Sequence, residues 1–394
     1  MKGISFNPPD RILFGPGPSP VHPRVLAALA RPTVGHLDPA FVEMMDDLKD
    51  GLREVFRTQN TLTFPFSGPA TVGQEALIVN LLERGDLFIA CINGVFGERM
   101  AQMAERAGAE VVRFQQPWGR AVDPQALRET LKAHPGAKLV GFVHAETSTG
   151  VLSDAESLVK EIHAAGAMAL MDCVTSLGGI RVDVDAWGVD AAYSGTQKCL
   201  ATPPGLGPVT LSQRAYDVIK ARKTPVQSWF MDITSQTKYW GGTGHGGRSY
   251  HHTAPINALY GLHEGLLMVH EEGLENAWAR HARVHKAFVA GVEAMGLAML
   301  VPPAEQANSI NTVRVPEGVD EAKVRERLMG EHNIAIGKGL GDFAGKVWRI
   351  GTMGRGATLD NARLCLSSLE AVLHQLGAKV KPGAAAAAIA AASA

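Results

Sequence analysis

The sequence predicts an α/β protein in which a large domain with a mostly parallel sheet precedes a smaller α+β domain. The chain has 394 residues, which is too long for one ordinary core. Short apolar runs alternate with amphipathic helical stretches over most of its length, as in βαβ units. A long helical region follows, and strands and helices then resume toward the C-terminus.

Apolar runs define the strands of the large domain. Ala137–Val143 (AKLVGFV), Ala167–Met171 and Asp190–Ser194 each predict a buried strand, and Asp172 closes the second. Between the first two, Ala155–Ala165 has helical spacing. Because sites in such sheets lie at the carboxyl ends of the strands, the residues that follow each run are the first candidates for function.

Helical spacing dominates residues 264–300, before the smaller domain. Strands are predicted at Ser309–Val315 and Lys346–Ile350, and helices at Asp320–Leu328 and Asn361–Leu376. We divide the chain into an N-terminal arm (1–20), a large domain (21–264), a small domain (265–380) and an alanine-rich tail (381–394). The tail is expected to be a frayed helix or disordered.

Composition argues against several classes of function. The 38 basic and 39 acidic residues leave a net charge of −1, so no basic excess exists to neutralise nucleic-acid phosphates. The first ten residues hold no apolar run typical of a signal peptide, and no window approaches a membrane span. The four cysteines form no C-x-x-C pair, and no histidine motif indicates a metal. We expect a cytoplasmic protein without a metal, nucleic-acid or membrane partner.

Lys198 and Asp172 are the candidate catalytic residues. Lys198 follows one apolar strand and precedes Pro203-Pro204-Gly205, at the expected mouth of a site. Partial burial would lower the pKa of its amine, as an imine-forming lysine requires. Asp172 ends a buried strand, where a carboxylate needs a partner such as a protonated pyridine nitrogen. Taken alone, Lys198 also fits a surface lysine, and Asp172 a helix cap or a structural ion pair.

The segment Ser67–Glu75 opens a helix that is predicted to run to about Glu83. Its small residues let backbone N–H groups approach an anion, and a helix N-terminus favours negative charge, so a phosphate fits there. An ordinary helix start, with Ser67 as the cap and Pro69 in the first turn, explains the same residues.

Several short motifs occur along the chain in a specific order. They are Gly15–Ser19, Ser67-Gly68, Asn93–Gly97, Glu146–Gly150, Asp172–Gly179, Ser194–Lys198, Pro203–Gly205, Tyr250–Thr253 and Arg349–Gly351. Together they resemble the class V branch of fold-type I pyridoxal 5'-phosphate (PLP) enzymes, specifically the alanine–glyoxylate and serine–glyoxylate (or serine–pyruvate) aminotransferases. The resemblance runs from about Leu13 to Leu376.

This resemblance implies a seven-stranded sheet in the large domain and a role for each matching residue. Lys198 would hold PLP as a Schiff base and later move the substrate's α-proton, and Asp172 would pair with the pyridinium nitrogen. Arg349 would bind the substrate's α-carboxylate, and Gly17 and His36 would lie near the substrate. The remaining residues implied to bind the cofactor are Ser67, Gly68, Ala70, Thr71, Phe96, Thr147, Val174, Gln197 and, from the neighbouring subunit of a homodimer, Tyr250 and Thr253.

Two positions depart from the family pattern. Phe96 stands where tryptophan is frequent, which keeps ring stacking but loses an N–H donor. Pro69 stands where serine or threonine is frequent, and proline offers neither an N–H nor a hydroxyl to a phosphate. These departures leave the individual phosphate contacts open.

The implied function is PLP-dependent transamination of alanine or serine, with glyoxylate or pyruvate as acceptor. Another class V reaction, such as cysteine desulfuration, would need a mobile cysteine. A catalytically silent PLP-binding protein would be expected to lack Lys198 or Arg349. The alternative hypothesis of an NAD-dependent dehydrogenase rests on Gly242–Gly247. This segment partly matches the dinucleotide-binding pattern G-x-G-x-x-G but follows no clear strand.

Overall fold

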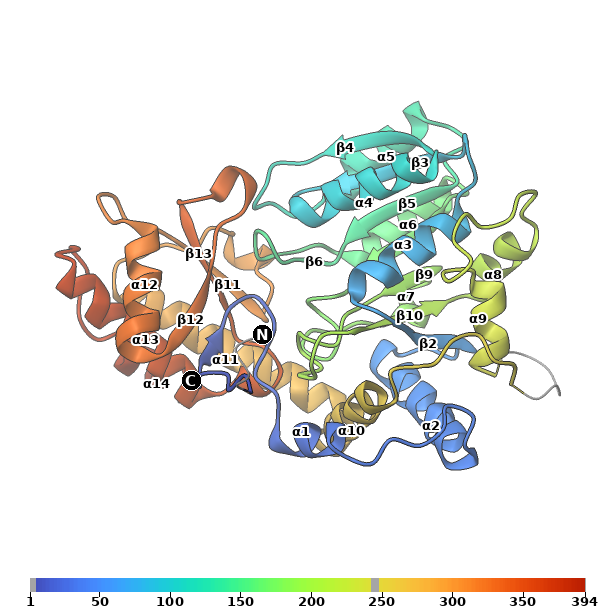
Figure 1. Ribbon diagram of the computed structural model, residues 1–394. Coiled ribbons are helices and arrows are strands. Elements are labelled where there is room, and N and C mark those ends of the chain that lie inside the picture. The colour runs from blue at the N-terminus through green and yellow to red at the C-terminus, as the bar shows by residue number, and fades with distance from the viewer. Residues whose placement is uncertain (1–4, 242–247, 394) are drawn as a thin grey trace.

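A computed structural model describes residues 5–241 and 248–393 (Figure 1). The molecule has a large and a small part, each built around its own sheet and its own apolar core. The predicted order, an α/β part followed by a smaller α+β part, is confirmed. The glycine-rich segment Gly242–Gly247 lies outside the described residues.

The large part contains a seven-stranded sheet in which only β10 runs antiparallel to its neighbours. Strands covered on both faces read as continuous apolar runs, which explains why β5 (LVGFV) is buried at every position. In lateral order the strands are β2 (Leu62–Ser67), β10 (Leu206–Leu211), β9 (Ala191–Tyr193), β8 (Met168–Asp172), β5 (Leu139–Val143), β3 (Leu87–Ile92) and β4 (Glu110–Gln115).

Helices pack around this sheet, and side-chain caps set the start of many of them (Figure 1). The Asp154 carboxylate accepts a hydrogen bond from Ser157 N and begins α6, for example. The helices of this part are α1 (Pro23–Leu29), α2 (Pro39–Phe56), α3 (Ala70–Leu81), α4 (Val95–Ala107), α5 (Pro124–Ala133), α6 (Ala155–Ala164), α7 (Val184–Trp187), α8 (Gln213–Lys220), α9 (Ile233–Tyr239) and α10 (Ile256–Glu272).

The small part holds a four-stranded sheet whose lateral order is β1, β12, β13, β11. Strand β1 comes from the N-terminal arm and pairs in parallel with β12, so the start of the chain completes this sheet. The strands are β1 (Ile12–Phe14), β11 (Ile310–Arg314), β12 (Ile334–Lys338) and β13 (Val347–Gly351), and the helices are α11 (Leu274–Ala294), α12 (Glu321–His332), α13 (Leu359–Gln375) and α14 (Ala384–Ser393). A two-stranded ribbon, β6 (Ala145–Glu146) with β7 (Val151–Leu152), and short 3-10 turns at Pro303–Glu305, Gly341–Phe343 and Gly354–Gly356 complete the fold.

The alanine-rich end of the chain forms a packed helix. Ala384 and Ala388 of α14 are buried in the core of the small part, next to α11 and α13. Gly291 permits this approach, because a Cβ added there would lie 2.9 Å from the Ala384 carbonyl oxygen. The expected domain boundary at residue 264 falls inside α10, whereas the apolar core of the large part still includes Leu274 and that of the small part takes over at Val284, both on α11.

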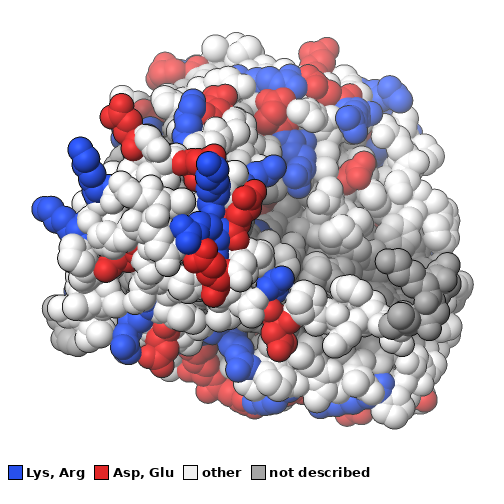
Figure 2. Space-filling view, turned by 60° about the vertical axis from the view of Figure 1, so that its left-hand side comes forward, with Lys and Arg blue, Asp and Glu red and all other residues white. Residues whose placement is uncertain are grey.

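On the face seen in Figure 2, acidic and basic side chains are interspersed. Within residues 5–241 and 248–393, no helix is long and apolar enough to cross a membrane. The same residues contain no group of three or more histidine, cysteine or acidic side chains placed to hold a metal ion.

Candidate active site

A cavity of about 160 Å³ lies at the carboxyl ends of β8 and β9, next to the first turns of α3 and α4. This is the edge at which the ligands of parallel sheets bind. Its walls are Pro69, Ala70, Thr71, Gln74, Phe96, Arg99, Thr147, Asp172, Val174, Tyr193, Gln197 and Lys198. The structure thus gathers eight of the predicted site residues: Ala70, Thr71, Phe96, Thr147, Asp172, Val174, Gln197 and Lys198.

A wider hollow of about 640 Å³ lies near Glu83 and Asp86, at the amino end of β3. Several of its charged groups already have partners: Lys138 pairs with Asp86, and Arg222 donates to the backbone carbonyls of Asn80 and Leu82. Position and pairing both favour the smaller cavity as the site of chemistry.

Lys198 is buried in the wall of the cavity, with its amine against an N-terminal strap, residues 15–19. Its Nζ donates to the Pro16 carbonyl, and a Cβ added to Gly17 would lie 2.7 Å from this Nζ. The Ser19 hydroxyl donates to the Lys198 carbonyl over 2.6 Å, which fixes the backbone. Burial, and next the positive charge of Arg349, lower the pKa of Lys198 to about 8. A useful fraction of the amine is therefore neutral at physiological pH.

Asp172 ends β8 with its carboxylate buried. Its Oδ1 accepts from Val174 N over 2.9 Å, and its Oδ2 accepts from the Tyr193 hydroxyl over 2.5 Å. Burial raises the pKa of Asp172 to about 6, and these two hydrogen bonds act in the opposite direction. A cationic partner would favour the ionised form further.

The start of α3 faces the cavity without a cap. Pro69 occupies the N-cap position and offers no side-chain hydrogen bond, while Ala70 and Thr71 line the wall. The amide Nε2 of Gln74 is buried and has no partner among the described residues. An uncapped helix N-terminus beside an unused donor fits an anion such as a phosphate.

Phe96 and Val174 present apolar surface to the same cavity. Glu146 holds the start of α4, because its Oε2 accepts from Phe96 N over 3.2 Å. Arg99, one turn further along α4, has its guanidinium 4.7 Å from the centre of the Phe96 ring. The Thr147 hydroxyl is hydrogen-bonded to the Thr175 hydroxyl, and Thr147 lines the cavity.

Arg349 brings the small sheet to this site. It lies on β13, where its Nε donates to the Lys338 carbonyl over 2.8 Å and its Nη1 donates to the Thr147 carbonyl over 3.0 Å. Burial lowers the pKa of Arg349 to about 10. The Arg349 guanidinium is thus held by one hydrogen bond within the small part, to Lys338, and by one to the large part, at Thr147.

Other predicted site residues lie outside the cavity wall. Ser67 bonds to His252 Nε2 over 2.6 Å, and Gly68, at φ +150°, packs against Val72. Tyr250 and Thr253 are exposed. The ring of His36 lies 5.2 Å from that of Tyr250, so the structure does not place it against the cavity of its own chain.

Sequence reasoning missed three residues of the wall: Gln74, Arg99 and Tyr193. Tyr193 lies within a predicted strand and reads as an ordinary core aromatic. Gln74 lies within the segment Ser67–Glu75, and Arg99 lies just beyond the motif Asn93–Gly97. Each lies one turn into its helix, which was the available signal.

The chain matches the family described as Aminotransferase class-V over residues 13–344. It belongs to the class V aminotransferases. It is 37% identical to (S)-ureidoglycine--glyoxylate transaminase of Bacillus subtilis, over 95% of this chain and 93% of that protein. It is 38% identical to alanine--glyoxylate aminotransferase of Callithrix jacchus, over 95% of this chain and 90% of that protein.

Solved structures agree with this family. The aminotransferase superposes with a TM-score of 0.92 on an alanine--glyoxylate aminotransferase from Nostoc sp., at 42% identity, covering 95% of this chain and 98% of that one. A pyridoxamine-pyruvate aminotransferase from Mesorhizobium loti gives a TM-score of 0.92 at 30% identity, covering 98% of both chains. The predicted fold-type I architecture is confirmed.

Class V aminotransferases are PLP enzymes, and the cavity fits this cofactor. Asp172 offers a buried carboxylate to the ring nitrogen, Val174 and Phe96 offer apolar surface to the ring, and Thr147 offers a hydroxyl. The uncapped start of α3 fits the phosphate, and the Lys198 amine fits the aldehyde.

Proposed function

We propose that this aminotransferase moves the amino group of alanine or serine to glyoxylate or pyruvate. The observation that carries the proposal is that Lys198 and Asp172 line one cavity, while Arg349 donates to the backbone carbonyl of Thr147 in its wall. The names of the relatives support glyoxylate or pyruvate as acceptor. Because the relative from Bacillus subtilis is named for ureidoglycine, this donor belongs in the same test.

When bound, PLP supplies an aldehyde for the incoming amine and a protonated ring that takes up electron density from the substrate's α-carbon. Asp172 would hold a proton at the ring nitrogen. Lys198, whose amine is neutral in part because of its lowered pKa, would accept the substrate's α-proton at its Nζ and then deliver that proton to the cofactor. Arg349 binds the α-carboxylate with its planar guanidinium, which orients the bond to that proton toward Lys198.

The enzyme is proposed to work as a homodimer, with Tyr250 and Thr253 of each chain reaching the phosphate of the other. In support, the large aromatic side chains of Trp229 and Tyr250 are exposed in the single chain, which is typical of an interface. Mixing a Lys198→Ala chain with a Tyr250→Ala chain tests this, since shared sites predict that the mixture regains activity that neither variant has alone.

Cytoplasmic location is part of the same proposal. Cys91, Cys173, Cys199 and Cys365 are all buried and free, as suits a reducing compartment. Their burial also argues against a cysteine desulfurase, which needs a mobile sulfur acceptor. Desulfurase structures share only the fold, at 15% identity. Both Lys198 and Arg349 are present, so the chain lacks the losses expected of a silent PLP-binding protein.

The decisive experiment is an absorbance titration of the PLP-loaded protein with L-alanine, L-serine and ureidoglycine, each at the same concentration. We expect the visible band to disappear with alanine or serine and to return when glyoxylate or pyruvate is added. A band that responds to ureidoglycine alone would identify ureidoglycine as the amino donor, and the protein would still be a transaminase. A band that responds to no amino donor would overturn the proposal.

A further inference from the structure

Tyr193 joins the candidate active site through its hydroxyl. It stands at the end of β9, directly beside Asp172 in the parallel pairing of β8 and β9. Its hydroxyl donates to Asp172 Oδ2 over 2.5 Å, while Val174 N donates to Oδ1. The two oxygens of Asp172 thus each have one fixed donor, which sets the plane of the carboxylate.

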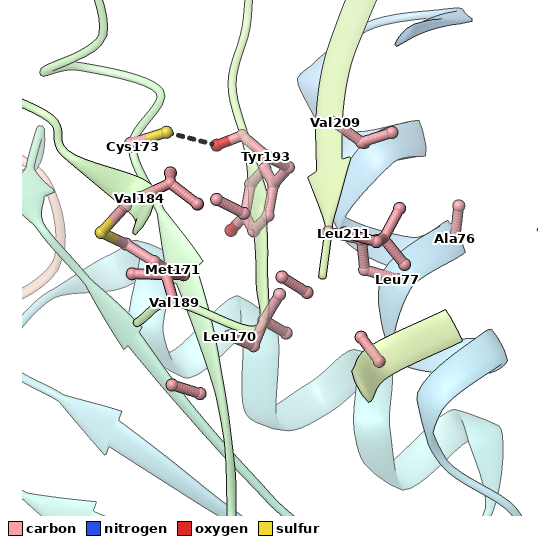
Figure 3. Close-up of a cluster of buried hydrophobic side chains, with 14 of the residues drawn as sticks. Ala76, Leu77, Leu170, Met171, Cys173, Val184, Val189, Tyr193, Val209 and Leu211 are labelled. Carbon is pink, nitrogen blue, oxygen red and sulfur yellow. Dashed lines mark hydrogen bonds between the residues drawn. The ribbon is translucent and has the colours of Figure 1, made fainter. Parts of the chain in front are cut away.

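The rest of Tyr193 is held in the apolar core. Figure 3 shows the residue between Leu170 and Met171 of β8 and Val209 and Leu211 of β10. Its backbone oxygen accepts from Cys173 N over 3.0 Å and from Cys173 Sγ over 3.2 Å. The side chain is fully buried, and its hydroxyl is the polar group that it brings to the cavity wall. An aromatic needed only for packing could be phenylalanine here.

The surrounding charges keep Tyr193 a donor. Burial, and next the charge of Asp172, raise the pKa of its phenol well above the ordinary value, so the hydroxyl keeps its proton at any working pH. The charge of Glu146 raises the pKa of the Asp172 carboxyl, and the charge of Lys198 lowers it. The charge of Arg99 lowers the pKa of the Tyr193 phenol, against the larger effects of burial and of Asp172. The phenol is therefore a permanent donor to a carboxylate that titrates.

A carboxylate that accepts such a bond is a weaker base. Without the bond, Asp172 would more readily take the proton that it must leave on the cofactor's ring nitrogen. We propose that Tyr193 is a positioning residue that aims the Asp172 carboxylate at the ring nitrogen and keeps it ionised, so that the ring stays protonated. This inference rests on the proposed function only in taking PLP as the ligand, whichever amino acid is the donor.

The test replaces Tyr193→Phe, which removes one oxygen and keeps the ring, and uses Tyr216→Phe on α8 as the matched control. We expect Tyr193→Phe to raise, by about one unit, the pH midpoint at which the visible band of the bound cofactor titrates, because a less protonated ring withdraws less charge from the imine nitrogen. The half-reaction with amino donor should slow roughly tenfold with little change in donor KM. Tyr216→Phe should match the parent.

A double-mutant cycle with Asp172→Asn separates positioning from packing. If Tyr193 acts through the carboxylate, Tyr193→Phe will cause no further shift of the midpoint in the Asp172→Asn background. A midpoint that stays unchanged in Tyr193→Phe, or a shift of equal size in both backgrounds, would overturn the inference. These spectra need no donor, so failure of alanine and serine as substrates would overturn the proposed function alone.

Discussion

The two sheets of the molecule both reach the candidate active site, but they contribute to it differently. The seven-stranded sheet and its helices provide the cavity wall, including Lys198 and Asp172. The four-stranded sheet provides Arg349, whose Nη1 reaches across to the Thr147 carbonyl. The cavity that fits the cofactor is thus built within one packed unit, whereas Arg349, the proposed ligand of the substrate carboxylate, depends on contact between two. Changes in the large sheet should therefore alter cofactor chemistry, and changes in the small sheet should alter substrate binding.

The largest effect is expected at Lys198. Lys198→Ala removes the amine that is proposed both to bond to PLP and to move the α-proton, so turnover should fall by about 10⁴-fold or more. Stopped-flow absorbance with L-alanine measures the loss, and Lys132→Ala, at an exposed lysine paired with Glu129, is the control. If Lys198→Ala kept the parent rate of the half-reaction with L-alanine, Lys198 would have no catalytic role.

A substitution in the small sheet should separate binding from cofactor chemistry. Arg349→Lys keeps a positive charge but loses the planar fork, so donor KM should rise roughly 10- to 100-fold. The absorbance spectrum and the affinity for PLP should stay close to those of the parent protein. Arg314→Lys, on the neighbouring strand β11, is the exposed control. Loss of PLP from Arg349→Lys would contradict the view that the large sheet holds the cofactor and the small sheet binds the substrate.

The pH dependence of cofactor uptake should report the contact between the two sheets. The neutral Lys198 amine is the form that attacks PLP, so uptake by the unloaded protein should speed up as the pH rises through about 8. The Arg349 charge helps to lower this pKa, so Arg349→Met should move the midpoint to higher pH. Uptake rates measured between pH 6 and 10, at about 0.15 M salt, test the direction. An unchanged midpoint would mean that Arg349 does not act on Lys198.

The smallest effect on chemistry is expected at the C-terminus. Truncation after Pro382 removes α14 and exposes the core of the small part beside α11, so the melting temperature should fall by about 2–4 °C or more. The spectrum of bound PLP should not change, because α14 contributes nothing to the cavity wall. Differential scanning calorimetry and an absorbance scan of the same sample measure both. A spectral change would show that the small sheet supports the cofactor as well.

Much of the fold was predictable because buried parallel strands leave continuous apolar runs. The predicted strands at Ala167–Met171 and Ser309–Val315 lie within one residue of β8 and β11 at each end. Strand β12 was missed, since its middle is only partly buried and it ends in Gly337 and Lys338. The pairing of β1 with β12 joins distant parts of the chain, and no local pattern reports such a pair.

The candidate site was predictable where a motif follows a strand, as at Asp172 and Lys198. A site residue was not predictable where its role depends on the direction in which its side chain points. Tyr193 looks like any apolar strand residue until the structure aims its hydroxyl at Asp172. The roles of Tyr250, Thr253 and His36 remain predictions, because they concern a second subunit or a substrate rather than the fold of one chain.

The N-terminal strap, residues 15–19, has a consequence for how the enzyme matures. It lies against the Lys198 amine, and it continues from β1, which needs β12 as its pairing partner. On the ribosome β1 emerges long before β12. The large sheet can therefore fold before β1 has its partner strand, while the Pro16 carbonyl is not yet fixed against the Lys198 amine. A chain that ends before Ile334 would keep the bonds of Ser19 to Gln197 and Lys198 but lose the partner strand of β1, so the arm is held at both of its ends only after β12 has been made.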